Sequence, residues 1–107
     1  MPFPPWTSID EAARLLADGR VVAIPTETVY GLAGNAYEPG ALAQIFVIKE
    51  RPTFDPLIVH VCDVAQIAEI ARDIPDAAYA LALAYWPGPM TMILPKKDCI
   101  PDLCTGP

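Results

Sequence analysis

Residues 25–32 place several chemically active side chains directly after a predicted strand. The motif P-T-E-T-V-Y-G-L offers two hydroxyls, a carboxylate, a phenol and a glycine. Such a density of polar groups at the end of a strand predicts a polar pocket. The plainer alternative is that Thr26 and Thr28 cap a turn, because hydroxyl side chains readily bond to nearby backbone. The residues alone leave both interpretations open, and Glu27 needs a charged partner only if it is buried.

Lys49 and Arg51 place two cations at the end of a predicted helix and the start of a proline-rich loop. An arginine fork and a lysine ammonium together suit phosphate, and this combination recurs in phosphoryl and nucleotidyl transfer. Composition alone favours the alternative that the cations only complement the helix dipole, an effect of about 0.3–1 kcal/mol. A phosphate-binding role therefore needs support from elsewhere in the chain.

His60 is the one histidine of the chain and lies in the apolar segment 57–62. In a strand it falls on the face opposite Leu57, Val59 and Val61, because side chains alternate between the two faces. A single histidine in such a segment is more often structural than catalytic, and no second histidine exists to share a metal. Neither a serine-hydrolase elbow nor a glycine-rich phosphate loop occurs, which argues against those two enzyme classes.

The elements that would position these residues alternate between helix and strand. Apolar residues at helical spacing, with capping boxes at Ser8 and Asp63, predict helices over 8–18, 39–49, 63–71 and 76–85. Apolar runs predict strands over 21–24, 57–62 and 90–94, and the first two are expected to be buried on both faces. Residues 50–56 and the tail 96–107 are expected to be irregular. The pattern predicts an α/β fold, in which ligands bind where strands end and loops begin.

Composition sets outer limits on the class of protein. The chain has 107 residues, 53% of them hydrophobic and 19% charged, which suits one domain and excludes a disordered tail. A formal charge of -6 argues against a general nucleic-acid surface. The apolar runs are too short to span a bilayer and residues 1–6 lack signal-peptide features, so a cytoplasmic location is expected. Cys62, Cys99 and Cys104 have no zinc-knuckle spacing and are expected to be reduced and structural, with no metal site.

Four motifs occur in order along the chain: P-T-E-T-V-Y-G-L at 25–32, I-F-x-I-K-x-R-P at 45–52, D-P-L-I-V-H-V at 55–61 and W-P-G-P-M-T at 86–91. Together they resemble the YrdC-like family of L-threonylcarbamoyladenylate synthases over nearly the whole chain. The resemblance implies an α/β fold with a twisted mixed sheet and flanking helices around a concave cavity.

The same resemblance implies an activity. The family forms threonylcarbamoyl-AMP and pyrophosphate from L-threonine, bicarbonate and ATP, with Mg²⁺ accompanying the ATP and no tightly bound cofactor. Its product feeds the N6-threonylcarbamoyl modification of adenosine 37 in tRNA. Expected partners are therefore the three substrates, together with tRNA or a downstream threonylcarbamoyl transferase complex.

Roles for individual residues also follow from the resemblance. Lys49 and Arg51 match the K-x-R half of the family's catalytic signature and would offset triphosphate charge during attack on the α-phosphorus. Thr28 and His60 match positions that contact L-threonine. Asp55 matches, with the two cations, positions that face ATP, although asparagine is commoner there in the family. Further candidates to line the cavity are Thr26, Tyr30 and Thr91.

The S-x-N half of the family signature has no counterpart in residues 1–107. We therefore expect these residues to be the N-terminal portion of one YrdC-like domain, truncated at its C-terminal side and inactive alone. A half-built sheet would leave an unpaired strand edge and an exposed apolar face.

Two other functions stay open. One is the YrdC-like module of a hydrogenase-maturation carbamoyltransferase, which would be flanked by acylphosphatase-like and zinc-binding segments that the chain does not show before Ser8. The other is a noncatalytic YrdC-like relative that binds RNA, and the acidic balance of the chain counts against it.

Overall fold

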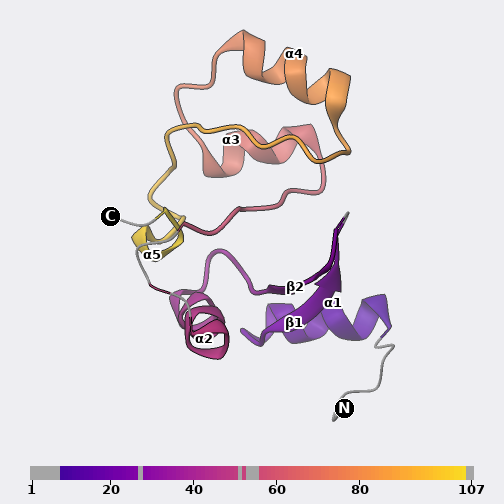
Figure 1. The fold of residues 1–107 in the computed structure, drawn as a ribbon. Coiled ribbons are helices and arrows are strands. Elements are labelled where there is room, and N and C mark those ends of the chain that lie inside the picture. The colour runs from indigo at the N-terminus through magenta and orange to yellow at the C-terminus, as the bar shows by residue number, and fades with distance from the viewer. Residues whose placement is uncertain (1–7, 27, 51, 53–55, 106–107) are drawn as a thin grey trace.

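The first helix begins and ends as its sequence predicts. A computed structural model describes residues 8–26, 28–50, 52 and 56–105 (Figure 1). Helix α1 (Ile9–Ala17) follows Ser8, whose Oγ accepts a hydrogen bond from Glu11 N at 3.1 Å. A side-chain cap of this kind is worth about 1 kcal/mol. The chain leaves the helix through Gly19 at φ 79°, a conformation that glycine adopts without steric cost. The predicted helix and its N-terminal cap are confirmed.

A β-hairpin follows α1, and the sequence predicted only its first strand. Strand β1 (Val22–Pro25) pairs antiparallel with β2 (Tyr30–Ala33), with Pro25 opposite Tyr30 at the turn. Burial alternates along β1, its first and third residues being half-buried and its second and fourth exposed. The expectation of burial on both faces is therefore wrong, because a two-stranded hairpin against α1 covers one face only.

Helix α2 (Pro39–Lys49) has the predicted bounds and carries part of the core. Its buried residues Leu42 and Ile45 form a cluster with Ile100 and Cys104, each of the last two being 2% exposed. The expectation of an irregular tail is therefore wrong. Residues 102–105 form the short helix α5 (Asp102–Thr105), which packs against α2 because the tail contributes these apolar side chains to the core.

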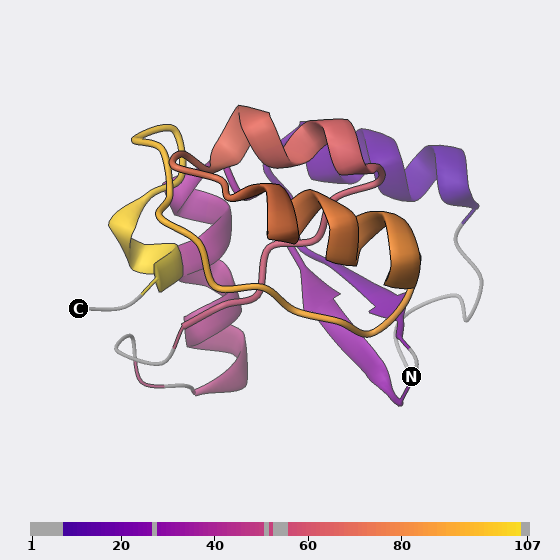
Figure 2. The ribbon, with the colours of Figure 1, turned by 90° about the horizontal axis from the view of Figure 1, so that it is seen from above.

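The second half of the chain contains two neighbouring helices, side by side in both views (Figures 1 and 2). The predicted helix 63–71 appears as a 3₁₀ turn, η1 (Val64–Gln66), followed by the short α3 (Ile67–Ile70). The capping box expected at Asp63 is wrong, since Asp63 makes no side-chain cap bond and Gln66 Oε1 instead accepts from Cys62 N at 2.6 Å. Helix α4 (Asp76–Tyr85) has the predicted bounds.

A second apolar cluster joins these helices to the segment that follows them. Ile67, Ala71 and Ala82 are its buried members, and Trp86, Met92 and Leu94 are among the half-buried residues packed against them. No helix in the described part of the chain is long and apolar enough to cross a membrane.

Segments 57–62 and 90–94 are extended, but within the described residues neither belongs to a sheet, so the two predicted strands are wrong as hydrogen-bonded strands. Residues 58–61 and 91–94 take part in none of the backbone hydrogen bonds of the described chain. Their side chains nevertheless alternate like those of a strand, with Ile58 65% exposed and Ile93 98% exposed between half-buried neighbours. Each segment therefore has strand-like packing on one face and an unpaired backbone.

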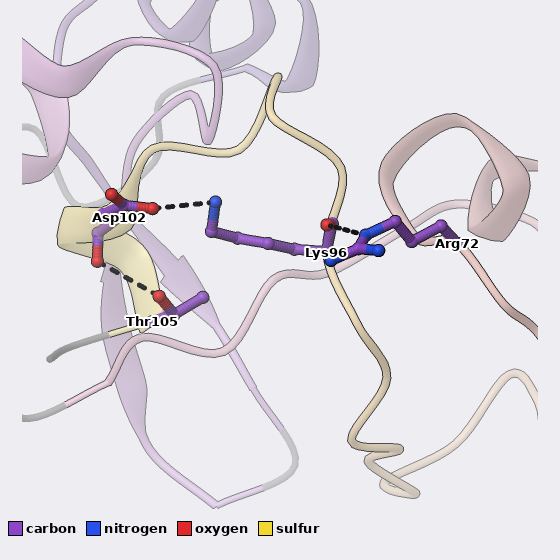
Figure 3. Close-up of polar contacts among 4 residues, drawn as sticks. All are labelled: Arg72, Lys96, Asp102 and Thr105. Atoms are coloured by element: carbon purple, nitrogen blue, oxygen red, sulfur yellow. Dashed lines mark hydrogen bonds and ion pairs between the residues drawn. The ribbon is translucent and has the colours of Figure 1, made fainter.

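The chain after residue 94 is bound to the end of α3 and to α5 (Figure 3). An isolated antiparallel bridge pairs Ala71 with Lys96, and Arg72 Nε donates to the Lys96 carbonyl oxygen at 3.2 Å. The Lys96 ammonium forms an ion pair with Asp102 at 2.9 Å, and Thr105 Oγ1 donates to the Asp102 carbonyl oxygen at 3.2 Å. These contacts connect the two halves of the fold.

The unpaired backbones predict fast amide hydrogen exchange. In the 107-residue chain, the amides of residues 58–61 and 91–94 should exchange at least about tenfold faster than those in the middle of α2 and α4, because exposed, unpaired amides need no opening step. Exchange followed by NMR measures this, with the two helices as internal controls. Equal protection in the extended segments would contradict the unpaired arrangement.

Cys104 should resist alkylation in the folded chain. Burial raises the pKa of the Cys104 thiol, the charge of Lys96 works in the opposite direction with the smaller effect, and the thiolate is the nucleophile. Cys62 and Cys99 are exposed. Mass spectrometry after iodoacetamide treatment should show two labelled cysteines under native conditions and three in denaturant. Labelling of Cys104 under native conditions equal to that of Cys62 and Cys99 would argue against its place in the core.

Candidate functional site

A cavity of about 660 Å³ lies among the hairpin, α2 and the extended segment 56–61. Most of its wall is apolar and comes from the hairpin, from α2 and from the core side of the extended segment. Its polar lining residues come from five different parts of the chain and are Thr26, Asn35, Tyr37, Lys49, His60, Gln66 and Glu69. The fold therefore brings together polar groups that are far apart in sequence.

The end of the hairpin supplies one threonine, Thr26, to the site. Thr26 follows β1 directly and lines the cavity. Its Oγ1 lies 3.4 Å from Thr28 Oγ1, and it also accepts from the backbone N–H groups of Thr28 and Val29. The turn-capping interpretation of these threonines is therefore confirmed for Thr26, which also lines a cavity whose wall is mostly apolar.

Lys49 is the last residue of α2 and lines the same cavity. It is exposed and has no ion-pair partner among the described residues. Directly after it, Glu50 adopts the left-handed conformation at φ 51°, which ends the helix and turns the chain. The site therefore has one unneutralised ammonium at a sharp bend, while its predicted partner Arg51 lies outside the described residues.

His60 lies on the extended segment and lines two cavities at once. The second cavity, of about 970 Å³, lies between residues 56–64 and residues 86–96, and Thr91 belongs to its wall. Residues 56–61 line both cavities, so this segment is a wall common to the two. The turn at 86–90 beside the second cavity is held by a 2.8 Å hydrogen bond from Trp86 Nε1 to the Met90 carbonyl oxygen.

The structure distributes the remaining sequence candidates as follows. Thr28 is exposed in the hairpin turn beside Thr26. Tyr30, expected to line the cavity, begins β2, is 71% exposed and lines neither cavity of the described structure. Asp55 lies outside the described residues.

Sequence reasoning missed two polar residues of the loop between β2 and α2. Asn35 and Tyr37 line the first cavity, and Asn35 Oδ1 accepts a hydrogen bond from Tyr37 N at 2.9 Å. An asparagine bonded to backbone two residues on is a common turn motif. In the sequence, the asparagine that follows Gly34 at the end of an apolar stretch was the signal that could have predicted a polar turn here.

The site is open to solvent. No polar or charged residue among those described is buried, so each ionisable group of the cavity keeps much of its hydration. The described residues hold no group of three or more histidine, cysteine, aspartate or glutamate side chains arranged to bind a metal ion. What this wall provides is the Lys49 ammonium, the Glu69 carboxylate, hydroxyl and amide groups and an imidazole, so a polar ligand with an anionic group would find its charge partner in Lys49.

The family assignment rests on most of the chain. Residues 14–107 match the Sua5/YciO/YrdC family model, whose description is "Telomere recombination". The chain therefore belongs to the Sua5/YciO/YrdC family, as its four motifs indicated.

Curated relatives carry a more specific name. The chain is 45% identical over 95 residues to the threonylcarbamoyl-AMP synthase of Pyrococcus abyssi, 46% identical over 94 residues to that of Bacillus subtilis, and 34% identical over 95 residues to that of Pseudomonas aeruginosa PAO1. These matches cover 89%, 88% and 89% of this chain, but only 28%, 26% and 51% of the relatives. The chain thus spans between about a quarter and a half of the length of these synthases.

Solved structures agree with the fold. A double-alanine variant of P. abyssi Sua5 matches with a TM-score of 0.86, and P. abyssi Sua5 complexed with L-threonine matches with a TM-score of 0.85. Both are 45% identical to this chain and cover 89% of it, while the chain covers 29% and 28% of them. The mixed α/β fold class inferred from the sequence is confirmed.

The left-handed residue beside Lys49 should be sensitive to side-chain branching. A β-branched side chain is strained at positive φ by about 1–2 kcal/mol, whereas glycine is not. The free energy of unfolding of Glu50→Val, measured by urea denaturation, should therefore be lower than that of Glu50→Gly by about this amount. Equal midpoints for the two variants would contradict the left-handed bend.

Proposed function

We propose that the full-length protein carrying this chain is a threonylcarbamoyl-AMP synthase. It combines L-threonine, bicarbonate and Mg-ATP into threonylcarbamoyl-AMP and releases pyrophosphate. The observation that carries this proposal is the first cavity, which gathers Lys49, His60 and the hairpin threonine Thr26 in a fold similar to that of a protein solved with L-threonine. The names of the curated relatives support the same activity.

The residues of the cavity suit two different parts of such a reaction. Lys49, with Arg51 two residues further along the chain, would neutralise charge on the triphosphate as the α-phosphorus is attacked and pyrophosphate leaves. An ammonium already in place costs no reorganisation at the moment of reaction, which is why such preorganised charge lowers barriers. By the family resemblance Asp55 would also face ATP, through an interaction with Arg51 or with the magnesium ion of Mg-ATP.

Other candidate residues suit the amino acid. Thr28 and His60 would bind L-threonine, with Thr91 in the adjoining cavity available to its wall. A site that hydrogen-bonds the substrate hydroxyl rejects analogues without it by large factors, because its own polar groups would otherwise stay unpaired. Serine should therefore be accepted far better than valine.

The proposal assigns only part of the enzyme to this chain. The chain covers at most about half of the synthases named above. We therefore propose that residues 1–107 alone do not catalyse the reaction, because the remaining catalytic groups lie elsewhere in the full-length protein. The product would pass to tRNA N6-threonylcarbamoyl modification in the cytoplasm.

Full-length protein should release pyrophosphate only when L-threonine, bicarbonate and Mg-ATP are all present. A coupled pyrophosphate assay measures this, and mass spectrometry of the mixture identifies threonylcarbamoyl-AMP. Omission of each substrate in turn is the control. A folded full-length protein that releases no threonine-dependent pyrophosphate would overturn the proposed function.

Lys49 offers a test that separates catalysis from helix stabilisation. Lys49→Ala should lower kcat/KM about 100-fold or more, because it removes charge stabilisation near the reacting phosphate. Arg14→Ala is the matched control, since Arg14 is the basic residue in the last turn of α1 and lines neither cavity. A helix-dipole role alone predicts similar small losses of stability, about 0.3–1 kcal/mol, and unchanged turnover for both variants. Equal turnover of the two variants would contradict the catalytic role of Lys49.

A further inference from the structure

Two extended segments of the chain have backbones without protein partners. Residues 58–61 and 91–94 take part in no backbone–backbone hydrogen bond among the described residues. Their burial nevertheless alternates from one residue to the next, which is the period of a β-strand. Backbone N–H and C=O groups in the interior of a protein are almost always paired. Each segment therefore has the side-chain pattern of a strand and lacks a neighbour to pair with.

Both segments also carry apolar side chains on two faces. The half-buried side chains pack against the two apolar clusters of the fold, and they are Leu57, Val59, Met92 and Leu94. On the opposite faces, Ile58 is 65% exposed and Ile93 is 98% exposed. Strands that are apolar on both faces are typical of the interior of a sheet that is covered on both sides. The two segments are therefore suited to a more buried position than the described residues give them.

The second cavity, of about 970 Å³, lies between the two segments. Ile58 and Ile93 both belong to its wall, together with the residues on either side of them. Adjacent strands of a sheet lie about 4.7–4.9 Å apart and are joined by hydrogen bonds. Because the two segments share no such bond, they are not adjacent strands, and the cavity occupies the space between them. The sequence predicted an unpaired edge, whereas the structure has a gap with an unpaired backbone on each side.

The described chain ends beside this cavity. Thr105, the last described residue, belongs to α5 and lines the second cavity. Its neighbour Cys104 accepts a hydrogen bond from Leu57 N at 2.7 Å through its carbonyl oxygen, so α5 lies at the start of the first extended segment. The chain covers between 26% and 51% of the three synthases compared above, so a large part of each lies outside the matched region. A chain that continues from α5 therefore starts at the wall of the gap.

We propose that a β-strand from the part of the full-length protein after residue 107 occupies the second cavity and pairs with residues 58–61 on one side and 91–94 on the other. This strand is apolar, because a charged side chain beside Ile58 and Ile93 would lose its hydration without gaining a partner. Residues 56–61 also line the first cavity, so the same strand fixes the segment that carries His60. The inference concerns the fold and does not rest on the proposed function.

Amide hydrogen exchange of the full-length protein, followed by NMR, tests the pairing. Alternate amides of residues 58–61 and 91–94 should exchange as slowly as those in the middle of α2 and α4, because alternate amides of a strand point to the same neighbouring strand. This is the opposite of the fast exchange expected in the 107-residue chain. In deuterated full-length protein, nuclear Overhauser effects from the protected amides should lead to residues numbered above 107.

Three results would overturn the inference. The first is fast exchange throughout both segments in the full-length protein. The second is a direct set of nuclear Overhauser effects between residues 58–61 and residues 91–94, which would mean that the gap closes without an inserted strand. The third is contacts from these amides to a second copy of the protein, detected in a mixture of differently labelled molecules, which would make the occupant another subunit.

A matched pair of threonine variants tests the same placement through stability. Ile93 and Val29 are both β-branched and mostly exposed, but only Ile93 lines the second cavity. In the full-length protein, Ile93→Thr should lower the melting temperature by about 4 °C or more, because the hydroxyl replaces an apolar contact with the inserted strand. Val29→Thr should stay within about 2 °C of the unmodified protein. Failure of Ile93→Thr alone to fold is the extreme of the expected loss, and equal shifts for the two variants would overturn the inference.

Discussion

The extended segment 57–62 is attached at its start to α5 and at its end to Gln66, whose Oε1 accepts from Cys62 N. Leu57 N donates to the Cys104 carbonyl oxygen at 2.7 Å, and Cys104 Sγ donates to the Leu57 carbonyl oxygen at 3.7 Å. Residues 58–61 themselves make no backbone–backbone hydrogen bond in the described structure, and residues 56–61 line both cavities. The position of His60 therefore depends on the packing of α5 against α2.

The cavity combines a rigid frame with accessible polar groups. Its apolar wall comes from the core, where Leu42, Ile45 and Cys104 are nearly inaccessible to water. Its polar groups lie at element ends, with Thr26 after β1 and Lys49 at the end of α2. Such positions keep a side chain hydrated while the backbone beneath it is fixed. With an overall charge of -6, attraction of an anionic ligand to this cavity would depend on a local cation such as Lys49.

Much of the fold could be predicted because local signals were strong. The cap at Ser8, the proline at the start of α2 and the W-P-G-P sequence after α4 are short-range features, and the bounds of these helices followed from them. Strand β2 was not predicted because Tyr30 and Gly31 follow a polar turn, and residues beside such a turn are typical of a loop. Helix α5 was missed because its four residues have no periodicity, and only contact with α2 gives the chain a reason to turn there.

The sequence by itself determined the candidate residues, through their types and their order in four motifs, and it determined the helices whose signals are local. It could not determine which candidates share a cavity, because that depends on contacts between segments far apart in the chain. Only the tertiary structure placed Lys49 and His60 on one cavity and left Tyr30 outside it. The physical reason is that strand pairing, burial and hydrogen bonds between segments depend on two segments at once, whereas a sequence pattern describes one segment at a time.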